Sequence, residues 1–373
     1  MKKTILTAAA IGVGATGAQA GGVERSSQSL GFLFEKGDYV ELNFSSVNPS
    51  VSGATSTTTG PLPAGSSSGD MAPSYMTLGM AYKNQLNDKF ALGFTVDQPI
   101  GADVAYPLAL YPFAGATAEI DSTGYTLFGK YSAGNNISVI GGIRAEQASG
   151  RVNDLPNGMG GTYSMSTNTD LAYGYVLGLA WEKPEIAARV ALSYNSAIDH
   201  TFDVLENGGP SLPFTTTVPQ SLNLEFQTGV AADTLVFGNI KWREWSELDI
   251  TPVGFQMATG SSLVDLDDDT VTINLGVGRR LNENWSVAVL AGGEKENGGF
   301  SGNLSPTDGY ASIGLAATYT QDNMKITGGI QYIDVGSANT ITSGTAGPGG
   351  GPSFARFEDN SAIGVGVRIG YSF

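Results

Sequence analysis

The sequence predicts an all-β fold, a transmembrane antiparallel up-and-down β-barrel of about fourteen strands. Three observations support this prediction: the pattern of the last strand, an export signal, and connections that alternate in length. One face of the last strand carries only large apolar residues, Ile363, Val365, Val367, Ile369, Tyr371 and Phe373. Gly, Arg and Ser residues occupy the other face, which is typical of the closing strand of an outer-membrane barrel.

The N-terminus predicts export. Lys2 and Lys3 precede a short apolar run, and Ala18-Gln19-Ala20 forms a small-x-small cleavage site, so residues 1–20 are expected to be a signal peptide. The run is too short for the roughly 20 apolar residues of a membrane-spanning helix. We therefore expect the outer membrane of a Gram-negative bacterium, with outer-membrane lipid and lipopolysaccharide around the barrel and Phe373 recognised by the barrel-assembly machinery.

Connection lengths alternate along the chain. Alternating stretches are expected to form strands near 38–47, 72–83, 89–97, 120–132, 136–147, 167–182, 186–205, 218–231, 234–246, 269–281, 284–295, 306–320, 323–335 and 360–373. Short turns between these strands alternate with long connections near 48–71, 98–119, 148–166, 206–217, 247–268, 296–305 and 336–359. Short periplasmic turns and long extracellular loops are the arrangement of an outer-membrane barrel. Residues 21–37 then precede the first strand, and residues 38–373 form the expected barrel.

Composition and charge exclude some functions. The chain has a formal net charge of −16 at pH 7 and no cluster of basic residues, which argues against a nucleic-acid partner. It contains no Cys, so neither a disulfide framework nor a Cys-ligated metal site is available. We expect no cofactor.

Charged residues on the barrel strands are expected to face the lumen, because charges facing lipid at mid-depth are costly. On the alternation above, these residues are Lys130, Arg144, Glu146, Arg189, Glu225, Lys241, Arg243 and Arg368. We expect them to form ion pairs that satisfy the barrel interior or, in the case of Arg144, Arg189 and Arg243, to bind a ligand carboxylate. The sequence favours the ion pairs and leaves both interpretations open.

Four stretches resemble one transporter family. They are Tyr194–Phe202, with the pattern Tyr-x-Ser-x-aliphatic-x-His, Val218–Leu222, Trp242–Ser246 and Gln98–Gly101. Together with the strand count, they resemble the FadL-type outer-membrane transporters of long-chain fatty acids and other hydrophobic compounds. The resemblance implies a fourteen-stranded barrel plugged by an N-terminal hatch, and a break in the third strand through which ligand leaves sideways into the membrane.

The resemblance implies roles for two groups of residues. Leu30, Phe32, Leu33 and Phe34 are the expected hatch, although the segment before the first strand is shorter than in the family. Pro99 removes a ladder donor and Gly101 permits a kink, so this pair marks either an ordinary strand end or the lateral gap.

The second long connection is unusually apolar. It contains Tyr106, Leu108, Leu110, Tyr111 and Phe113, which are expected either to capture a hydrophobic ligand or to pack against neighbouring loops. The expected function is passive uptake of long-chain fatty acids or similar hydrophobic molecules: capture on these loops, binding in the lumen, hatch displacement and lateral exit.

Two alternatives remain: a general diffusion porin, and an outer-membrane lipid-cleaving enzyme. The enzyme would have to be built around His200, the only His, and we assign no catalytic residue. The acidic run Asp265–Asp269 lacks the spacing of a calcium loop, so a solvated acidic loop is favoured over a cation site and no metal is expected.

Overall fold

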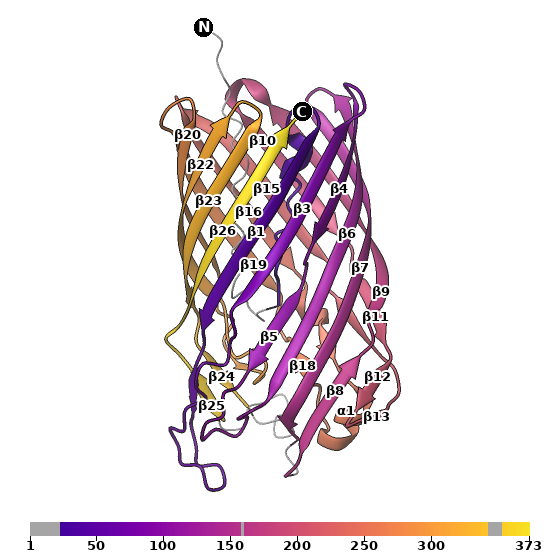
Figure 1. The fold of residues 1–373 in the computed structure, drawn as a ribbon, viewed down its shortest axis with the longest axis vertical. Helices are drawn as coiled ribbons and strands as arrows, with labels where there is room; N and C mark the ends of the chain where they lie inside the picture. The colour runs from indigo at the N-terminus through magenta and orange to yellow at the C-terminus, as the bar shows by residue number, and fades with distance from the viewer. Residues whose placement is uncertain (1–22, 158–159, 342–352) are drawn as a thin grey trace.

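The computed structural model describes residues 23–157, 160–341 and 353–373 of the chain. The predicted signal peptide, residues 1–20, lies outside the described residues. Fourteen antiparallel strands form a closed barrel (Figure 1), which confirms the predicted fold class. The barrel closes where β1 (Tyr39–Ser50) pairs along its whole length with β26 (Asn360–Ser372).

The remaining strands of the wall follow in chain order. They are β3 (Tyr75–Gln85), β4 (Phe90–Asp97), β6 (Thr117–Gly134), β7 (Ile137–Pro156), β9 (Asp170–Lys183), β10 (Ala188–Asn195), β15 (Ser221–Ala231), β16 (Thr234–Arg243), β19 (Thr270–Arg280), β20 (Trp285–Glu294), β22 (Tyr310–Gln321) and β23 (Met324–Val335). Short turns lie at one end of the barrel, together with the C-terminus, and long connections lie at the other end (Figure 1). This segregation confirms the predicted alternation, and the end with the short turns is the periplasmic end.

Shorter strands extend the wall at the extracellular end. β5 (Gly101–Ala105) continues the third strand, and β8 (Thr162–Thr167), β11 (Ile198–Phe202), β12 (Val204–Glu206), β13 (Gly209–Pro210) and β14 (Phe214–Val218) lie beyond the neighbouring long strands. The extracellular connections also contain β2 (Gly53–Thr55), β17 (Asp249–Ile250), β18 (Val264–Asp265), β21 (Phe300–Ser301), β24 (Ala338–Thr340), β25 (Ala355–Phe357) and α1 (Val253–Thr259). Three 3₁₀ turns, η1 (Gly31–Phe34), η2 (Pro184–Ile186) and η3 (Trp245–Glu247), complete the described elements.

Side-chain facing follows the sequence pattern inside the bilayer. The large apolar residues of β26 from Ile363 to Tyr371, and Phe373 after it, are exposed on the outside, and the alternate positions of the strand are buried or half-buried. All eight charged residues that were predicted to face the lumen are buried or half-buried on the inner face. None of the helices within the described residues is long and apolar enough to span a membrane.

The alternation inverts along β7. Near its periplasmic end, Ile143 is exposed outside and Arg144 is buried inside. Near its extracellular end, Arg151 is exposed outside and Val152 is buried inside. Lipid covers the outer face of the first region and water covers the second, so the apolar face changes sides.

This inversion corrects part of the sequence prediction. Residues 98–119 and 148–166 were expected to be loops, but they contain β5, the extracellular end of β7, and β8. The apolar-out pattern that identifies membrane strands stops at the bilayer surface, while the backbone ladder continues beyond it.

Candidate functional site

The N-terminal segment, residues 23–37, runs inside the barrel. Leu30, Phe32 and Leu33 are buried in an apolar cluster with inward residues of the wall, among them Phe128, and Phe34 packs against it. Glycines of the wall make room for this segment: a Cβ on Gly93 would lie 2.6 Å from a Leu33 methyl group. The predicted hatch residues therefore fill the periplasmic half of the lumen.

Polar contacts fix the same segment to the wall. The N–H of Leu30 donates to the Glu225 carboxylate at 3.1 Å, and the Lys83 ammonium donates to the carbonyl of Glu35 at 2.6 Å. Glu35 also forms an ion pair with Lys325 at 2.8 Å. The segment is thus held by apolar packing and by buried polar contacts together.

The third strand is interrupted between β4 and β5. β4 pairs with β3 only from Met80 to Gln85, and the register between β5 and β6 covers residues 101–105. At the break, the side chain of Gln98 accepts a hydrogen bond from the N–H of Leu78 at 3.2 Å, and the hydroxyl of Ser122 accepts one from the N–H of Ile100 at 2.9 Å. Side chains thus replace ladder bonds around Pro99.

The N-terminal segment pairs with this break. The N–H of Gly101 donates to the carbonyl of Val23 at 2.8 Å, and the N–H of Arg25 donates to the carbonyl of Pro99 at 3.1 Å. The guanidinium of Arg25 also donates to the carbonyl of Gly101 at 3.0 Å. Residues 23–25 therefore act as a short strand beside the interruption.

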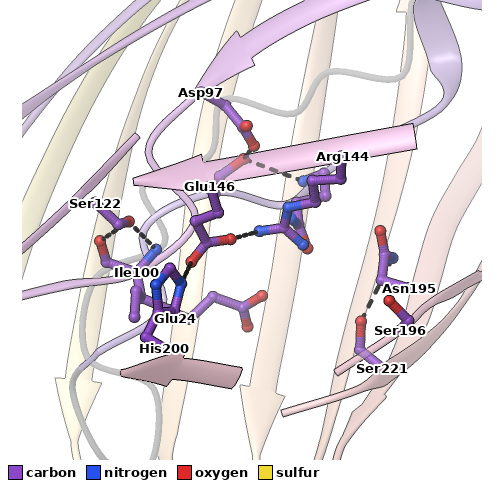
Figure 2. A network of polar contacts seen from close by, with 12 residues as sticks. Glu24, Asp97, Ile100, Ser122, Arg144, Glu146, Asn195, Ser196, His200 and Ser221 are labelled. Carbon is purple, nitrogen blue, oxygen red and sulfur yellow. Dashed lines mark hydrogen bonds and ion pairs between the residues drawn. The ribbon is translucent and has the colours of Figure 1, made fainter. Parts of the chain in front are cut away.

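Between Val23 and Arg25, Glu24 enters a buried charged network. Its carboxylate forms ion pairs with Lys241 and, at 3.1 Å, with Arg243, and all three side chains are buried. On β7, Arg144 forms an ion pair with Glu146. Figure 2 shows Glu146 between Arg144 and His200, with Glu24 close by. The network crosses the lumen and ties the N-terminal segment to the opposite wall.

His200 lies at the extracellular edge of this network and is fully buried. Its Nδ1 is 2.9 Å from the Asp170 carboxylate, and its Nε2 is 3.9 Å from the nearer Glu146 oxygen. The second distance is too long for a hydrogen bond. Within the described residues, neither this nitrogen nor this oxygen has a hydrogen-bond partner.

An apolar pocket of about 80 Å³ lies directly beyond His200, towards the extracellular loops. Its wall consists of inward side chains from the region where the alternation is inverted, including Val104, Ala148, Val152, Phe202 and Phe214. Val23 closes it on the side of the N-terminal segment. We call this volume the apolar pocket.

A second cavity, of about 140 Å³, lies at the interruption of the third strand. Polar residues of the N-terminal segment line it, from Arg25 to Ser29, and so do the lipid-facing residues Phe44, Leu78 and Met80. We call it the break cavity. Its lining contains both inward residues, such as Phe128, and outward residues, such as Leu78.

The five apolar residues of the second long connection separate into two groups. Tyr106, Tyr111 and Phe113 are buried in a loop core with Phe354, and burial raises the pKa of both phenols, so they stay neutral. Leu108 and Leu110 are 92% and 77% exposed. None of the five lines the apolar pocket. Loop packing thus accounts for the first group, and capture of ligand stays a prediction for the two leucines.

The three arginines that were candidate partners of a ligand carboxylate lie in two different parts of the lumen. Arg144 and Arg243 lie in the buried network below the apolar pocket, each beside a carboxylate. Arg189 lies far along the lumen, where its guanidinium is 4.7 Å above the ring of Phe34 in the hatch. None of the three lines the apolar pocket.

In the acidic run, Asp269 accepts hydrogen bonds from Ser246 at 2.6 Å and from the Trp242 indole at 3.2 Å. Burial and the nearby Asp249 carboxylate raise the pKa of Asp265. No group of three potential metal ligands occurs among the described residues.

Sequence reasoning missed the residues that build the pocket. Glu24 and Val23 lie in a short polar stretch without periodicity, and nothing local identifies their partners. Phe202 and Phe214 carried a usable signal, because they alternate with polar residues on β11 and β14, which are paired strands.

Comparison with known proteins agrees with this geometry. A family model described as outer membrane protein transport protein (OMPP1/FadL/TodX) matches residues 29–373. No curated protein matches the chain. A solved FadL homologue of Pseudomonas aeruginosa is 14% identical, with a TM-score of 0.69 over 92% of each chain.

Two toluene transporters of known structure have similar folds. TodX of Pseudomonas putida is 14% identical, with a TM-score of 0.64 over 95% of this chain and 96% of that one. TbuX of Ralstonia pickettii is 13% identical, with a TM-score of 0.59 over 91% and 90%. The fold, the outer-membrane location and the match along nearly the whole chain agree, and the chain therefore belongs to the outer membrane protein transport protein (OMPP1/FadL/TodX) family.

Proposed function

We propose that this protein is a passive outer-membrane channel for the uptake of hydrophobic molecules of the size of fatty acids or aromatic hydrocarbons. Such a molecule is captured at the exposed leucines of the extracellular loops and binds in the apolar pocket. Displacement of residues 23–25 then gives access to the break cavity, and the molecule leaves sideways into the membrane beside Pro99. The flow is downhill, so no energy source is needed.

One observation carries this proposal: two residues of the N-terminal segment that are separated by a single residue line different cavities. Val23 lines the apolar pocket, and Arg25 lines the break cavity. Glu24, between them, is fixed to Lys241 and Arg243 across the lumen. Residues 23–25 are therefore a partition between the two cavities, and a ligand passes only when the partition moves.

The pocket favours a neutral hydrocarbon body over a fatty-acid anion. Its lining is almost entirely apolar, and burying an unpaired carboxylate there would be costly. Arg144 and Arg243 already face Glu146 and Glu24, so we assign them to the ion-pair role that the sequence favoured. Within the expected class of fatty acids and similar molecules, we therefore infer that neutral members are preferred.

The rival functions have less support. A general porin needs a water-filled lumen, but the hatch residues Leu30, Phe32 and Leu33 fill the periplasmic half. A lipase needs a nucleophile beside its histidine, but within the described residues Nε2 of His200 has no hydrogen-bond partner. We also propose that lipid and lipopolysaccharide cover the outer face and that the assembly machinery recognises the exposed Phe373.

A pair of substitutions on β7 tests the pocket. Ala148→Trp fills the apolar pocket, whereas Gln147→Trp adds the same side chain to the exposed outer face. In cells that depend on this channel, uptake of radiolabelled ethylbenzene is expected to fall to background in the first variant and to persist in the second. Equal uptake by both variants would show that transport does not use this pocket. Faster uptake of oleate than of ethylbenzene would contradict the neutral preference.

A further inference from the structure

Three polar atoms interrupt the wall of the apolar pocket. Nε2 of His200, the hydroxyl of Thr216 and the hydroxyl of Ser305 belong to lining residues, and each atom is buried without a hydrogen-bond partner among the described residues. Thr216 is the register partner of His200 in the β11–β14 ladder, so these two residues share one level of the pocket. A buried polar group without a partner is costly, which makes this level a candidate for ligand recognition.

The hydrogen-bonding role of His200 follows from Asp170. A carboxylate only accepts hydrogen bonds, so Nδ1–H of His200 donates to Asp170 across the 2.9 Å contact. In the neutral imidazole the other ring nitrogen then has a lone pair and no proton. In this neutral form of the ring, Nε2 is an acceptor.

A second acceptor faces it. The nearer oxygen of Glu146 lies 3.9 Å from Nε2 of His200, and the other carboxylate oxygen is bound by Arg144. Two acceptors at this separation form no bond with each other, but one donor placed between them reaches both. His200 lines the apolar pocket, and so does Ala148, which lies one inward position above Glu146 on β7. Glu146 does not line the pocket itself but lies beside His200 at its lower end, and we call this pair the floor of the apolar pocket.

We propose that His200 and Glu146 select hydrophobic molecules that carry a hydroxyl group, as alcohols and phenols do. This inference rests on the proposed function, because it assigns the substrate class of the same pocket. The hydroxyl donates to the acceptor pair, and its oxygen is free to accept from Thr216, while the hydrocarbon body fills the space beside Val152 and Phe202. A hydroxyl both donates and accepts, and this floor offers partners for both roles.

The same geometry disfavours two other classes of ligand. A pure hydrocarbon buries the acceptor pair without a donor, so a pocket built for a hydroxyl discriminates against the analogue that lacks it. A carboxylate brings a third negative charge beside Glu146 and Asp170 and has no proton to donate. Arg144 does not compensate for this charge, because its guanidinium is already paired with Glu146.

Three matched probes test the proposal: 4-ethylphenol, ethylbenzene and 4-ethylbenzoate. Their binding to the purified barrel in amphipol is measured at neutral pH by equilibrium dialysis in sealed cells. The wild-type protein is expected to bind 4-ethylphenol about tenfold more tightly than ethylbenzene, because one buried acceptor pair is satisfied only by the phenol. Binding of 4-ethylbenzoate is expected to be the weakest of the three.

Two variants test whether His200 and Glu146, the floor of the pocket, cause the preference for 4-ethylphenol over ethylbenzene. His200→Phe keeps a planar ring and removes the acceptor, so the ratio of the two affinities is expected to fall to about one. Glu146→Gln replaces an acceptor oxygen by an amide and is expected to reduce the same ratio. Thr201→Val changes the exposed neighbour of His200 and is the control. Heat-dependent migration on gels shows whether each barrel is folded.

The outcomes separate this inference from the function on which it depends. If wild-type protein binds both neutral probes equally, or if His200→Phe keeps the preference for the phenol, hydroxyl selection is wrong and the hydrophobic pocket stands. If neither probe binds, or if Ala148→Trp leaves binding unchanged, the pocket itself is not the binding site. A preference for 4-ethylbenzoate would overturn both the hydroxyl selection and the neutral preference.

Discussion

The bilayer-spanning part of the barrel and its extracellular part have opposite interiors. In the first region the inner face carries ion pairs such as Arg144 with Glu146, while apolar residues face lipid. In the second region the inner face carries Val152 and Phe202, while polar residues such as Arg151 face water. The barrel interior is therefore apolar in its extracellular part. Directly on the periplasmic side of this apolar part, the interior carries charged residues.

This difference between the two interiors indicates which step of the proposed transport has the highest barrier. A hydrophobic molecule gains free energy on entering the apolar pocket, because apolar surface leaves water. In the proposed mechanism, the molecule then passes the buried network around Glu24 and enters the break cavity, whose lining includes lipid-facing residues such as Leu78. The boundary between the two interiors, where residues 23–25 form the proposed partition, is the gate in that mechanism.

The largest expected effect comes from breaking this boundary. Glu24→Gln removes the charge that compensates the buried cations Lys241 and Arg243, at a cost of about 3–5 kcal/mol. If about 3 kcal/mol of this cost weakens the docking of residues 23–25 against the wall, the population of barrels in which these residues are undocked rises by about a hundredfold. Ion conductance in planar bilayers and cleavage of the N-terminal segment by protease are both expected to increase.

Asp233→Asn is the matched control for that change. It removes a carboxylate from an ion pair with Arg280 at an exposed periplasmic turn, where such pairs contribute about 0–1 kcal/mol. Its conductance is expected to equal that of the wild type. If the conductance of Glu24→Gln also equals that of the wild type, the buried network does not hold the partition in place.

A smaller effect is expected at the lateral exit. Pro99→Val supplies a backbone N–H at the break, and one additional ladder bond contributes about 1 kcal/mol, which corresponds to about fivefold slower release of ligand. Release is measured as the transfer of bound ethylbenzene from the barrel into liposomes. Pro49→Val, at the end of β1, is the control. Unchanged release in Pro99→Val would indicate that ligand leaves by another route.

The extracellular region also contains a pH-sensitive contact. Glu206 accepts hydrogen bonds from the N–H groups of Gly254 and Phe255 at 2.8 and 2.9 Å, at the start of α1. Burial opposes ionisation of Glu206, but hydrogen bonds from Ser211, Tyr163 and these N–H groups outweigh it and lower the pKa of this carboxyl. Its contribution to stability is therefore complete above the ordinary Glu pKa of about 4.3 and is lost as the pH falls through the lower folded-state value.

Glu206→Gln tests this contact at neutral pH. Loss of the charged cap is expected to cost about 1 kcal/mol, so hydrogen-exchange protection of Gly254 and Phe255 falls about fivefold. In the wild type, protection corrected for intrinsic exchange is expected to decline in acid, and in the variant it is not. Equal protection in both proteins would assign the stability of α1 to packing of Phe255 instead.

The bilayer region could be predicted from sequence and the extracellular region could not, for a physical reason. Lipid imposes apolar residues at every second position, so Ile363 to Phe373 and the inward Arg144 and Arg243 can be placed from the pattern alone. Beyond the bilayer this constraint ends, and the pattern predicts loops where the structure has β5 and β8. The partition was equally hidden, because Glu24 and Lys241 are 217 residues apart in the sequence.

The second long connection shows the same limit at the level of single residues. Tyr106, Tyr111 and Phe113 are buried because Phe354, from a distant connection, completes their cluster. Leu108 and Leu110 come from the same apolar stretch and are exposed. Local hydrophobicity predicts only that the loop is covered or binds a ligand. Which of its apolar residues are buried and which are exposed depends on contacts with distant segments, which no local pattern encodes.

The smallest expected effect is at these leucines. Replacing Leu108 and Leu110 with Asp leaves folding nearly unchanged, within about 0.5 kcal/mol, because both side chains are exposed. Uptake of dilute ethylbenzene is expected to fall about twofold, since two apolar contacts at the mouth are lost, whereas affinity measured on the purified barrel stays the same. Leu212→Asp, at another exposed position of the extracellular end, is the control. If all three proteins take up ethylbenzene at one rate, ligand reaches the apolar pocket without capture at this loop, and the selectivity of the channel resides entirely in the inverted interior.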